Sequence, residues 1–285
     1  MRWQGRRQSD NVEDRRGIGG KGLAVGGGIG GLIIVVLFVL LGGNPDEVMQ
    51  SLQTTETAVP PTTAGQPLSE KDKEMGEFVS VVLADVEDVW NARFQELGQD
   101  YREPRLVLYT GTVDSGCGFS GAASGPFYCP EDEKVYLDLS FFEDMQRQLG
   151  APGDFALAYV IAHEVGHHVQ NLLGINDQVM AQRGRVSERE FNQLMVRMEL
   201  QADFLAGVWA HYARQATDFL ERGDLEEGIN AAGAVGDDRI QRQTQGHVVP
   251  DAFTHGSSEQ RIRWFRKGLE SGDIRQGDTF NTRDL

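Results

Sequence analysis

The sequence feature that most constrains the fold is a run of 19 residues, 23–41, in which no side chain is charged or polar. A membrane-spanning helix needs about 20 such residues, because each adds about 1.5 Å across a hydrocarbon core about 30 Å thick. A buried helix would rarely avoid every polar residue over this length, and no small-residue cleavage site of a signal peptide follows Leu41. We therefore expect residues 23–41 to form one transmembrane helix rather than a buried helix or a signal peptide.

The charges on either side of this run predict its orientation. Asp46 and Glu47 follow it, whereas the residues before it include Arg2, Arg6, Arg7, Arg15, Arg16 and Lys21. Because basic residues stay on the cytoplasmic side of a membrane helix, residues 1–22 are expected to form a basic cytoplasmic segment of a single-pass protein. The rest of the chain would then lie on the outer face of the cell membrane, in the periplasm or outside the cell. Overlapping GxxxG pairs within the span also suggest a homodimer through this helix.

Composition divides the rest of the chain. Residues 44–68 are rich in Pro and Thr, lack apolar periodicity and are expected to tether a domain to the membrane. Residues 69–285 are expected to form that domain, because hydrophobic residues make up 40% of the chain and charged residues 25%, as in ordinary folded proteins. The net charge of −16 argues against a nucleic-acid-binding protein, whose binding face would be basic.

Periodicity within the domain predicts both helices and short strands. Ser187 and Glu190 form a capping box ahead of a long helical pattern. Two short segments rich in β-branched and aromatic residues are typical of strands. The expected elements are helices over 69–97, 152–174 and 187–221 and strands over 106–109 and 135–139. The expected fold class is therefore α+β, with a small sheet and a single transmembrane helix before the domain.

The helix expected over 152–174 carries the sequence His163-Glu164-Val-Gly-His167-His168. His163 and His167 are four residues apart, so their imidazoles project from one helix face and can bind one metal ion. Glu164 is close enough to hold a water on that metal. His168 is rotated by about 100° from His167, which favours either a structural role or a role in supporting the metal ligands from outside. Two surface histidines are the alternative, but the apolar residues 157–161 before the motif predict a buried helix.

A catalytic zinc site needs a third protein ligand. The extended motif HExxHxxGxxH fails, because this chain has Gln170 and Leu173 at the required positions. Glu199 on the next helix is the alternative ligand, and Asp203, four residues later on the same face, can accept the free N–H of a ligating histidine. A solvated helix face is the usual place for such acids, but the residues around these two are largely apolar.

Cys117 and Cys129 are the two cysteines of the chain, and 12 positions separate them. The outer face of a membrane permits disulfides, so we expect these two to pair. Two unpaired thiols are the alternative, and the spacing fits no zinc motif.

These motifs resemble the putative neutral zinc metallopeptidase family of membrane-anchored bacterial proteins over the whole chain. The matching stretches are 1–16, 125–130, 135–142, 163–168, 199–203 and 255–265. The resemblance implies a zincin fold. At the metal residues, the chain is also similar to the broader gluzincin proteases. It also implies that His255 donates to the oxyanion, that Arg261 orients His255 or Asp203, and that the strand 135–139 is the sheet edge to which an extended peptide adds.

The function expected from the residues and the resemblance is that of a membrane-anchored zinc metallopeptidase acting on peptide or protein substrates. His163, His167 and Glu199 would bind Zn²⁺, Glu164 would be the general base, and His255 would stabilise the oxyanion. The alternative is a membrane-anchored binding or scaffolding protein with a structural or vestigial zinc site. A structural site normally has four protein ligands and needs no glutamate between its histidines, which favours the enzyme.

Overall fold

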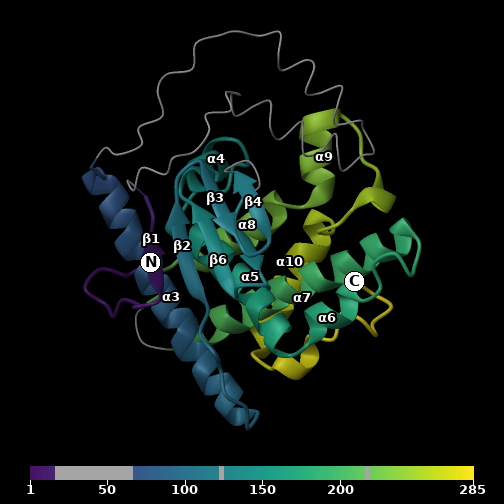
Figure 1. Cartoon of the computed structure of the whole chain (residues 1–285), viewed down its shortest axis with the longest axis horizontal. Helices are drawn as coiled ribbons and strands as arrows, with labels where there is room; N and C mark the ends of the chain where they lie inside the picture. Colours follow the sequence, from purple (N-terminus) through teal and green to yellow (C-terminus); the bar gives the residue numbers. More distant parts are fainter. Residues whose placement is uncertain (17–66, 122–124, 216–218) are drawn as a thin grey trace.

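The computed structural model describes residues 1–16, 67–121, 125–215 and 219–285 (Figure 1). The predicted α+β class is confirmed, with a small sheet packed against long helices. The predicted membrane span 23–41 and nearly all of the predicted tether 44–68 lie outside these residues. None of the helices in the described ranges has the length and hydropathy needed to cross a membrane.

The main sheet has the strand order β1-β2-β6-β5. The parallel strands are β1 (Val12–Asp14), β2 (Arg105–Tyr109) and β6 (Lys134–Asp138), and β5 (Phe127–Cys129) pairs antiparallel with β6. A separate antiparallel hairpin consists of β3 (Thr112–Ser115) and β4 (Gly118–Gly121). The strands predicted over 106–109 and 135–139 are thus confirmed as β2 and β6, to within one residue at each end.

Alternation along the strands gives the sheet two buried faces. Leu108 and Leu137 belong to the main core that the sheet shares with the helices. Val107 and Tyr136 point the other way and form a smaller cluster with Val113 of the hairpin. Successive side chains of a strand point to opposite faces, so both faces of these short strands are covered.

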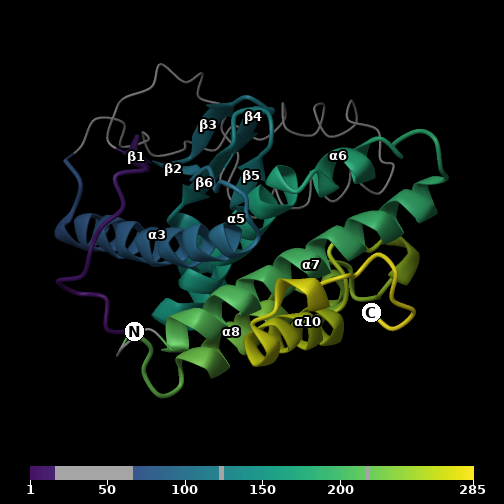
Figure 2. The same ribbon diagram turned by 90° about the horizontal axis from the view of Figure 1, so that it is seen from below.

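The helices form a stack on one face of the sheet. They are α3 (Glu70–Glu96), α4 (Ser140–Arg147), α5 (Asp154–Leu172), α6 (Ile175–Met180), α7 (Glu188–Gln215), α8 (Asp224–Ala234), α9 (Asp237–Gln245) and α10 (Ser258–Ser271), with the 3-10 turns η2 (Pro250–Ala252) and η3 (Ile274–Gln276). Figure 2 shows α7, α8 and α10 together on the side away from the sheet, with α5 between them and the strands. The three predicted helices are confirmed as α3, α5 and α7, although residues 219–221 are not helical, so α7 ends before the predicted Glu221.

Helix starts follow the capping signals in the sequence. The Ser187 hydroxyl accepts a hydrogen bond from the Glu190 backbone N–H, while the Glu190 carboxylate accepts one from the backbone N–H of Ser187. Ser69 and Asp72 form the same reciprocal pair at the start of α3. Such boxes satisfy two backbone donors that a helix start would otherwise leave unpaired, which fixes where each helix begins.

Two glycines let α7 and α10 approach backbone to backbone. A Cβ on Gly207 would lie 2.1 Å from the carbonyl oxygen of Phe265, and one on Gly268 would lie 2.0 Å from that of Phe204. No other residue fits without moving a helix. The pair lies between the two helices seen side by side in Figure 2.

Residues 1–16 belong to the domain. β1 pairs in register with β2, with Val12 opposite Leu106, and extends the main sheet at one edge. This corrects the predicted boundary, which separated residues 1–22 from a domain that starts at residue 69. Three residues of strand have little propensity signal of their own, because their stability comes from pairing with a distant strand.

The opposite edge of the main sheet is β5, so the prediction that the strand over 135–139 is an edge is wrong. β6 lies between β2 and β5 and is paired on both sides. The predicted disulfide is confirmed, with an S–S distance of 2.08 Å between Cys117 and Cys129. It fastens the β3–β4 hairpin to the end of the edge strand.

Candidate zinc site

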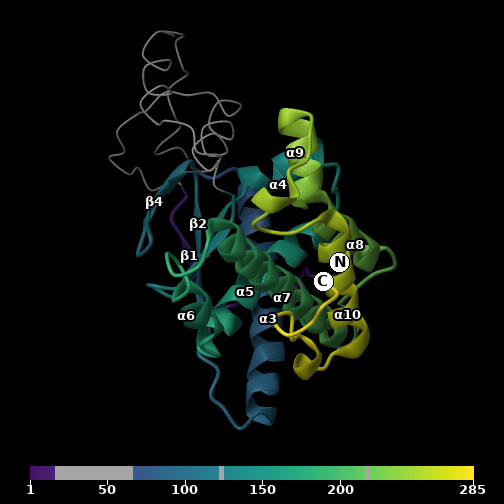
Figure 3. The same ribbon diagram turned by 90° about the vertical axis from the view of Figure 1, so that its right-hand side faces the viewer.

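The close approach of α5 and α7 brings the predicted metal-site residues together. A Cβ on Gly166 would lie 3.0 Å from the carbonyl oxygen and 3.2 Å from the Cα of Ala202, so the two helix backbones nearly touch there. The histidine motif on α5 and the two acids on α7 lie within one turn of this contact. Figure 3 shows α5 and α7 crossing in the interior of the molecule.

His163, His167 and Glu199 form what we call the ligand cluster, whose three donor atoms lie within 4.8 Å of one another. The Nε2 atom of His163 lies 3.2 Å from Oε2 of Glu199, and that of His167 lies 3.5 Å from Oε1. A zinc ion about 2.0–2.2 Å from each tetrahedral ligand requires ligand separations of about 3.3–3.5 Å. Both separations from the carboxylate are close to this range, and the donor types, two imidazoles and one carboxylate, are those of catalytic zinc sites.

The outer nitrogen of His163 is fixed by a buried carboxylate. Its Nδ1 lies 2.9 Å from Oδ1 of Asp203, which has no exposed surface. Asp203 also accepts hydrogen bonds from the Tyr159 hydroxyl and from Nε and Nη2 of Arg261, at 2.8 and 2.9 Å for the guanidinium. A proton on Nδ1 leaves the Nε2 lone pair of His163 for the metal. Arg261 thus contacts Asp203, one of the two partners that the family resemblance implied.

The outer nitrogen of His167 has a partner that the sequence analysis missed. Nδ1 of His167 lies 2.9 Å from Oε1 of Gln170, whose amide nitrogen donates to the carbonyl oxygen of Met198 and to Oε1 of Gln201. Position 170 is the one at which the chain departs from the HExxHxxG pattern. The side chain there orients a ligand, and its i, i+3 spacing from His167 was the available signal.

The electrostatics of the cluster favour a bound cation. Burial disfavours charge on His163, but Asp203 and Glu199 outweigh this effect and raise the pKa of His163 to about 10. Burial also opposes ionisation of Glu199, yet the two imidazoles hold the pKa of Glu199 well below its usual range. Positive charge is thus stabilised at the histidine nitrogens. A metal ion competes with protons for these same nitrogens, so metal binding here releases protons.

Glu164 lies on α5 between the two histidines and is 8% exposed. Within the described part of the chain, no hydrogen bond is made to its carboxylate. Both of its oxygens are therefore available to a water molecule next to the ligand cluster. A carboxylate in this position can accept a proton from that water.

His255 lies on the loop before α10 and is held by an aspartate that the sequence analysis did not identify. Its Nδ1 lies 3.2 Å from Oδ1 of Asp237, and its backbone N–H donates to Oδ2 of the same residue at 2.7 Å. Partial burial of the imidazole lowers the pKa of His255, but the hydrogen bond to Asp237 and the charge of Glu199 outweigh this effect and raise it. This half-exposed imidazole can act as a hydrogen-bond donor to a developing anion.

The other three histidines lie outside the ligand cluster. His168 is fully buried, with Nε2 2.6 Å from the carbonyl oxygen of Arg102 and Nδ1 2.9 Å from the hydroxyl of Tyr128 on the edge strand β5. His211 contacts the carbonyl oxygen of Leu269, and His247 is exposed on a loop. His168 thus ties the edge strand to the helix that carries the metal ligands.

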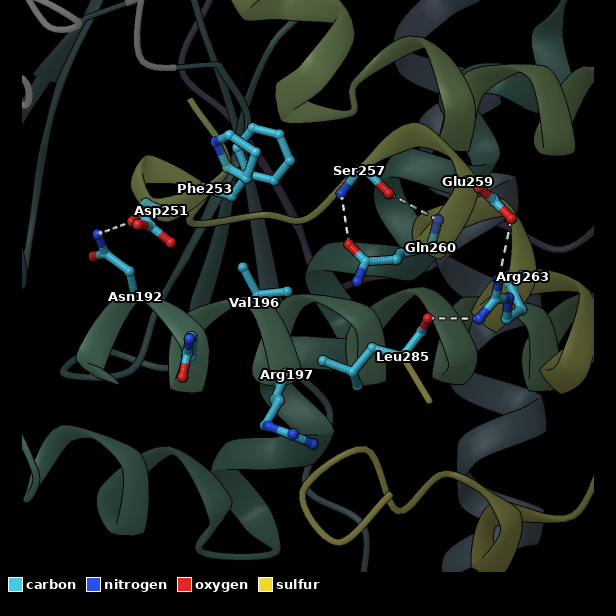
Figure 4. Close-up of a pocket in the computed structure, with 12 residues that line it drawn as sticks. Asn192, Val196, Arg197, Asp251, Phe253, Ser257, Glu259, Gln260, Arg263 and Leu285 are labelled. Carbon is cyan, nitrogen blue, oxygen red and sulfur yellow. Dashed lines mark hydrogen bonds and ion pairs between the residues drawn. The ribbon is translucent and has the colours of Figure 1, made fainter. Parts of the chain in front are cut away.

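A cavity of about 640 Å³ lies beside the His255 loop (Figure 4). Val196, one turn before Glu199 on α7, faces it, and Phe253 and Ser257 line it at the two ends of the loop. Arg263 at its rim donates to Glu259 and to the carbonyl oxygen of Leu285. The cavity therefore has both apolar and charged lining residues. Some of them are close in sequence to Glu199 and His255.

Asp203→Asn tests how the carboxylate behind His163 supports metal binding. Asparagine can still accept the Nδ1–H of His163, but it removes the negative charge that polarises the imidazole and pairs with Arg261. We expect zinc affinity to fall about 10–100-fold. The measurement is a competition titration with a zinc chelator. Asp85→Asn is the matched control. Asp85 lies on α3 and accepts a hydrogen bond from Trp209 of α7, so the zinc affinity of this variant should be unchanged. Equal affinities for both variants and the unsubstituted protein would contradict this role of Asp203.

Comparison with known proteins gives similarity over nearly the whole chain. The family described as "Putative neutral zinc metallopeptidase" matches residues 1–280. The uncharacterized protein YpfJ of Escherichia coli (strain K12) is 51% identical over 286 residues, which cover 98% of this chain and 99% of that protein. The uncharacterized protein Rv2575 of Mycobacterium tuberculosis (strain ATCC 25618 / H37Rv) is 41% identical over 259 residues, 87% of this chain and 86% of that protein. No solved structure matches the chain.

Proposed function

The chain belongs to the putative neutral zinc metallopeptidase family, and from this premise we propose that it is a zinc-dependent peptidase with Glu164 as its general base. The observation that carries the proposal is the ligand cluster with an unpaired carboxylate beside it. Three protein ligands suit a zinc ion that keeps one position for water or substrate, whereas a structural site normally has four. Within the described residues, the ligand cluster consists of three side chains.

The roles of the residues follow from their chemistry. A zinc ion held by the ligand cluster would lower the pKa of a water and polarise the carbonyl of a peptide bond. Glu164 would accept the proton of the attacking water and deliver it to the leaving amine. His255, kept in place by Asp237, would donate a hydrogen bond to the oxyanion, a contact worth about 3–4 kcal/mol in comparable sites.

The edge strand β5 is the proposed docking strand for an extended peptide. It is antiparallel to β6, and its Tyr128 contacts His168 on the helix of the ligand cluster. Addition of a strand to a free sheet edge supplies main-chain hydrogen bonds without requiring a particular sequence. The substrate class supported in this way is an extended peptide or an unfolded segment of a protein.

The proposal is tested by metal content and proteolysis of the same preparation. We expect about one zinc per chain by elemental analysis and hydrolysis of casein, an unstructured substrate. Removal of zinc by a chelator should reduce hydrolysis to background, and added zinc should restore it. A zinc-loaded protein that cleaves neither casein nor a random peptide library would instead be a non-catalytic binding or scaffolding protein. A protein without affinity for zinc would refute the site itself.

A further inference from the structure

The N-terminal residues 1–16, which we call the arm, are built into the same folded unit as the ligand cluster. The Ser9 hydroxyl donates to Oε1 of Glu87 at 2.6 Å, and the backbone N–H of Ser9 donates to the carbonyl oxygen of Ser80 at 3.0 Å. The Ser80 hydroxyl in turn donates to the carbonyl oxygen of Ser9 at 2.9 Å. The side chains of Ser9, Ser80 and Glu87 are buried between the arm and α3. Leaving them without partners would cost about 1–3 kcal/mol for each buried polar group.

The arm also completes the main sheet. β1 is hydrogen-bonded in parallel to β2 over three residue pairs, from Val12 opposite Leu106 to Asp14 opposite Leu108. Without the arm, β2 would become an edge strand with unpaired backbone groups over a buried core. Arm and domain therefore stabilise each other.

The last residue of the arm is locked beside the start of α3. Arg16 is 6% exposed. Its guanidinium forms two hydrogen bonds to the carboxylate of Asp14 and donates from Nη1 to the carbonyl oxygen of Asp72 at 2.8 Å. Its guanidinium occupies the space that a side chain at Gly76 would need. Arg16 and the first turn of α3 are therefore neighbours in the fold.

Five of the six basic residues that predicted a cytoplasmic N-terminus have partners in this fold, and the sixth, Lys21, lies outside the described residues. Arg7 donates to the carbonyl oxygen of Ala84 and to Asp88, and Arg6 lies 4.6 Å from the ring centre of Phe219. Arg2 forms an ion pair with Glu221, Arg15 with Glu13, and Arg16 with Asp14. The folded domain therefore gives a second reason for these charges, and their presence does not by itself orient a membrane helix.

We propose that the arm and the rest of the domain, residues 69–285, lie on the same side of the membrane. A run of 19 apolar residues is long enough for one crossing only, at about 1.5 Å per residue. One crossing would place residues 1–16 and 69–285 on opposite faces. Strand pairing between β1 and β2 cannot extend through a bilayer, so the docked arm and a single crossing exclude each other. A second crossing would need another such run, and residues 42–66 include Pro45, Asp46, Glu47, Pro60 and Pro61.

The test is site-directed labelling of the full chain in intact cells stripped of their outer barrier. Gln8→Cys places a thiol on the exposed side of the arm, and Gln99→Cys places one on an exposed part of the domain. The native cysteines are paired and do not compete. Each variant is treated with a membrane-impermeant maleimide before and after detergent, and the ratio of the two signals is compared. We expect equal ratios, with both thiols labelled before detergent or both protected.

A second pair, Asp10→Cys and Gln95→Cys, repeats the comparison at other exposed positions in case one variant folds poorly. A difference of tenfold or more between arm and domain, in either direction, would overturn the proposal and support a single crossing with an undocked arm. The readout does not involve hydrolysis. The result for the arm is therefore independent of whether the protein is a peptidase.

Discussion

Replacement of Glu164 by glutamine should leave zinc bound and reduce peptide hydrolysis by about 10²–10⁴-fold or more. The amide has nearly the same size and can still hydrogen-bond to a water beside the ligand cluster, but it cannot accept that water's proton. Since Glu164 makes no hydrogen bond to any other described residue, the substitution removes the base without leaving a protein donor unpaired. Hydrolysis of casein and zinc per chain are measured on the same sample.

The zinc content of Glu164→Gln is its internal control. Full zinc with background hydrolysis supports a general base at this position. Full hydrolysis with full zinc would show that the protein is not a peptidase of the HExxH type. Loss of zinc together with hydrolysis would assign Glu164 to metal binding and refute its role as a free base.

Replacement of Glu199 by glutamine should instead remove the metal. Glutamine presents a neutral oxygen in place of the anion that lies 3.2 Å from His163 and 3.5 Å from His167. A substitution in the layer outside the ligands typically costs about 10–100-fold in metal affinity, so loss of an anionic ligand should cost at least about 100-fold. Hydrolysis should fall in parallel with zinc occupancy and recover in part at high zinc concentration.

Glu188→Gln is the matched control on the same helix. Its carboxylate is exposed in the first turn of α7, so zinc content and hydrolysis should remain at the level of the unsubstituted protein. Full zinc and full activity in Glu199→Gln would place the third ligand elsewhere. The parallel with gluzincin proteases would then fail.

The sequence predicted those parts of the fold and site that depend on local spacing. Capping boxes at Ser69 and Ser187 fixed the starts of α3 and α7, because these contacts join residues three positions apart. The ligands His163 and His167 are likewise related by one helical turn. Glu199 could be placed because an acid on a largely apolar helix needs a partner.

The parts that were missed depend on contacts between distant residues. Asp237 precedes the histidine that it holds by 18 positions, and no local pattern relates the two. β1 has three residues and exists through pairing with a strand more than ninety positions away. The edge position of β5 depends on the order of the strands, which periodicity within each strand does not contain.

The contact between Gly207 and Gly268 has a consequence for metal affinity. Glu199, Asp203 and Gly207 follow one another on α7 at intervals of four residues, about 6 Å of helix each. A backbone contact cannot relax through a change of rotamer, so the two absent side chains set the separation of α7 from α10. That separation determines whether Arg261 reaches Asp203. Zinc affinity would thus depend on Gly207, two helical turns from Glu199. A methyl group added there would change the separation of α7 and α10 without changing any ligand.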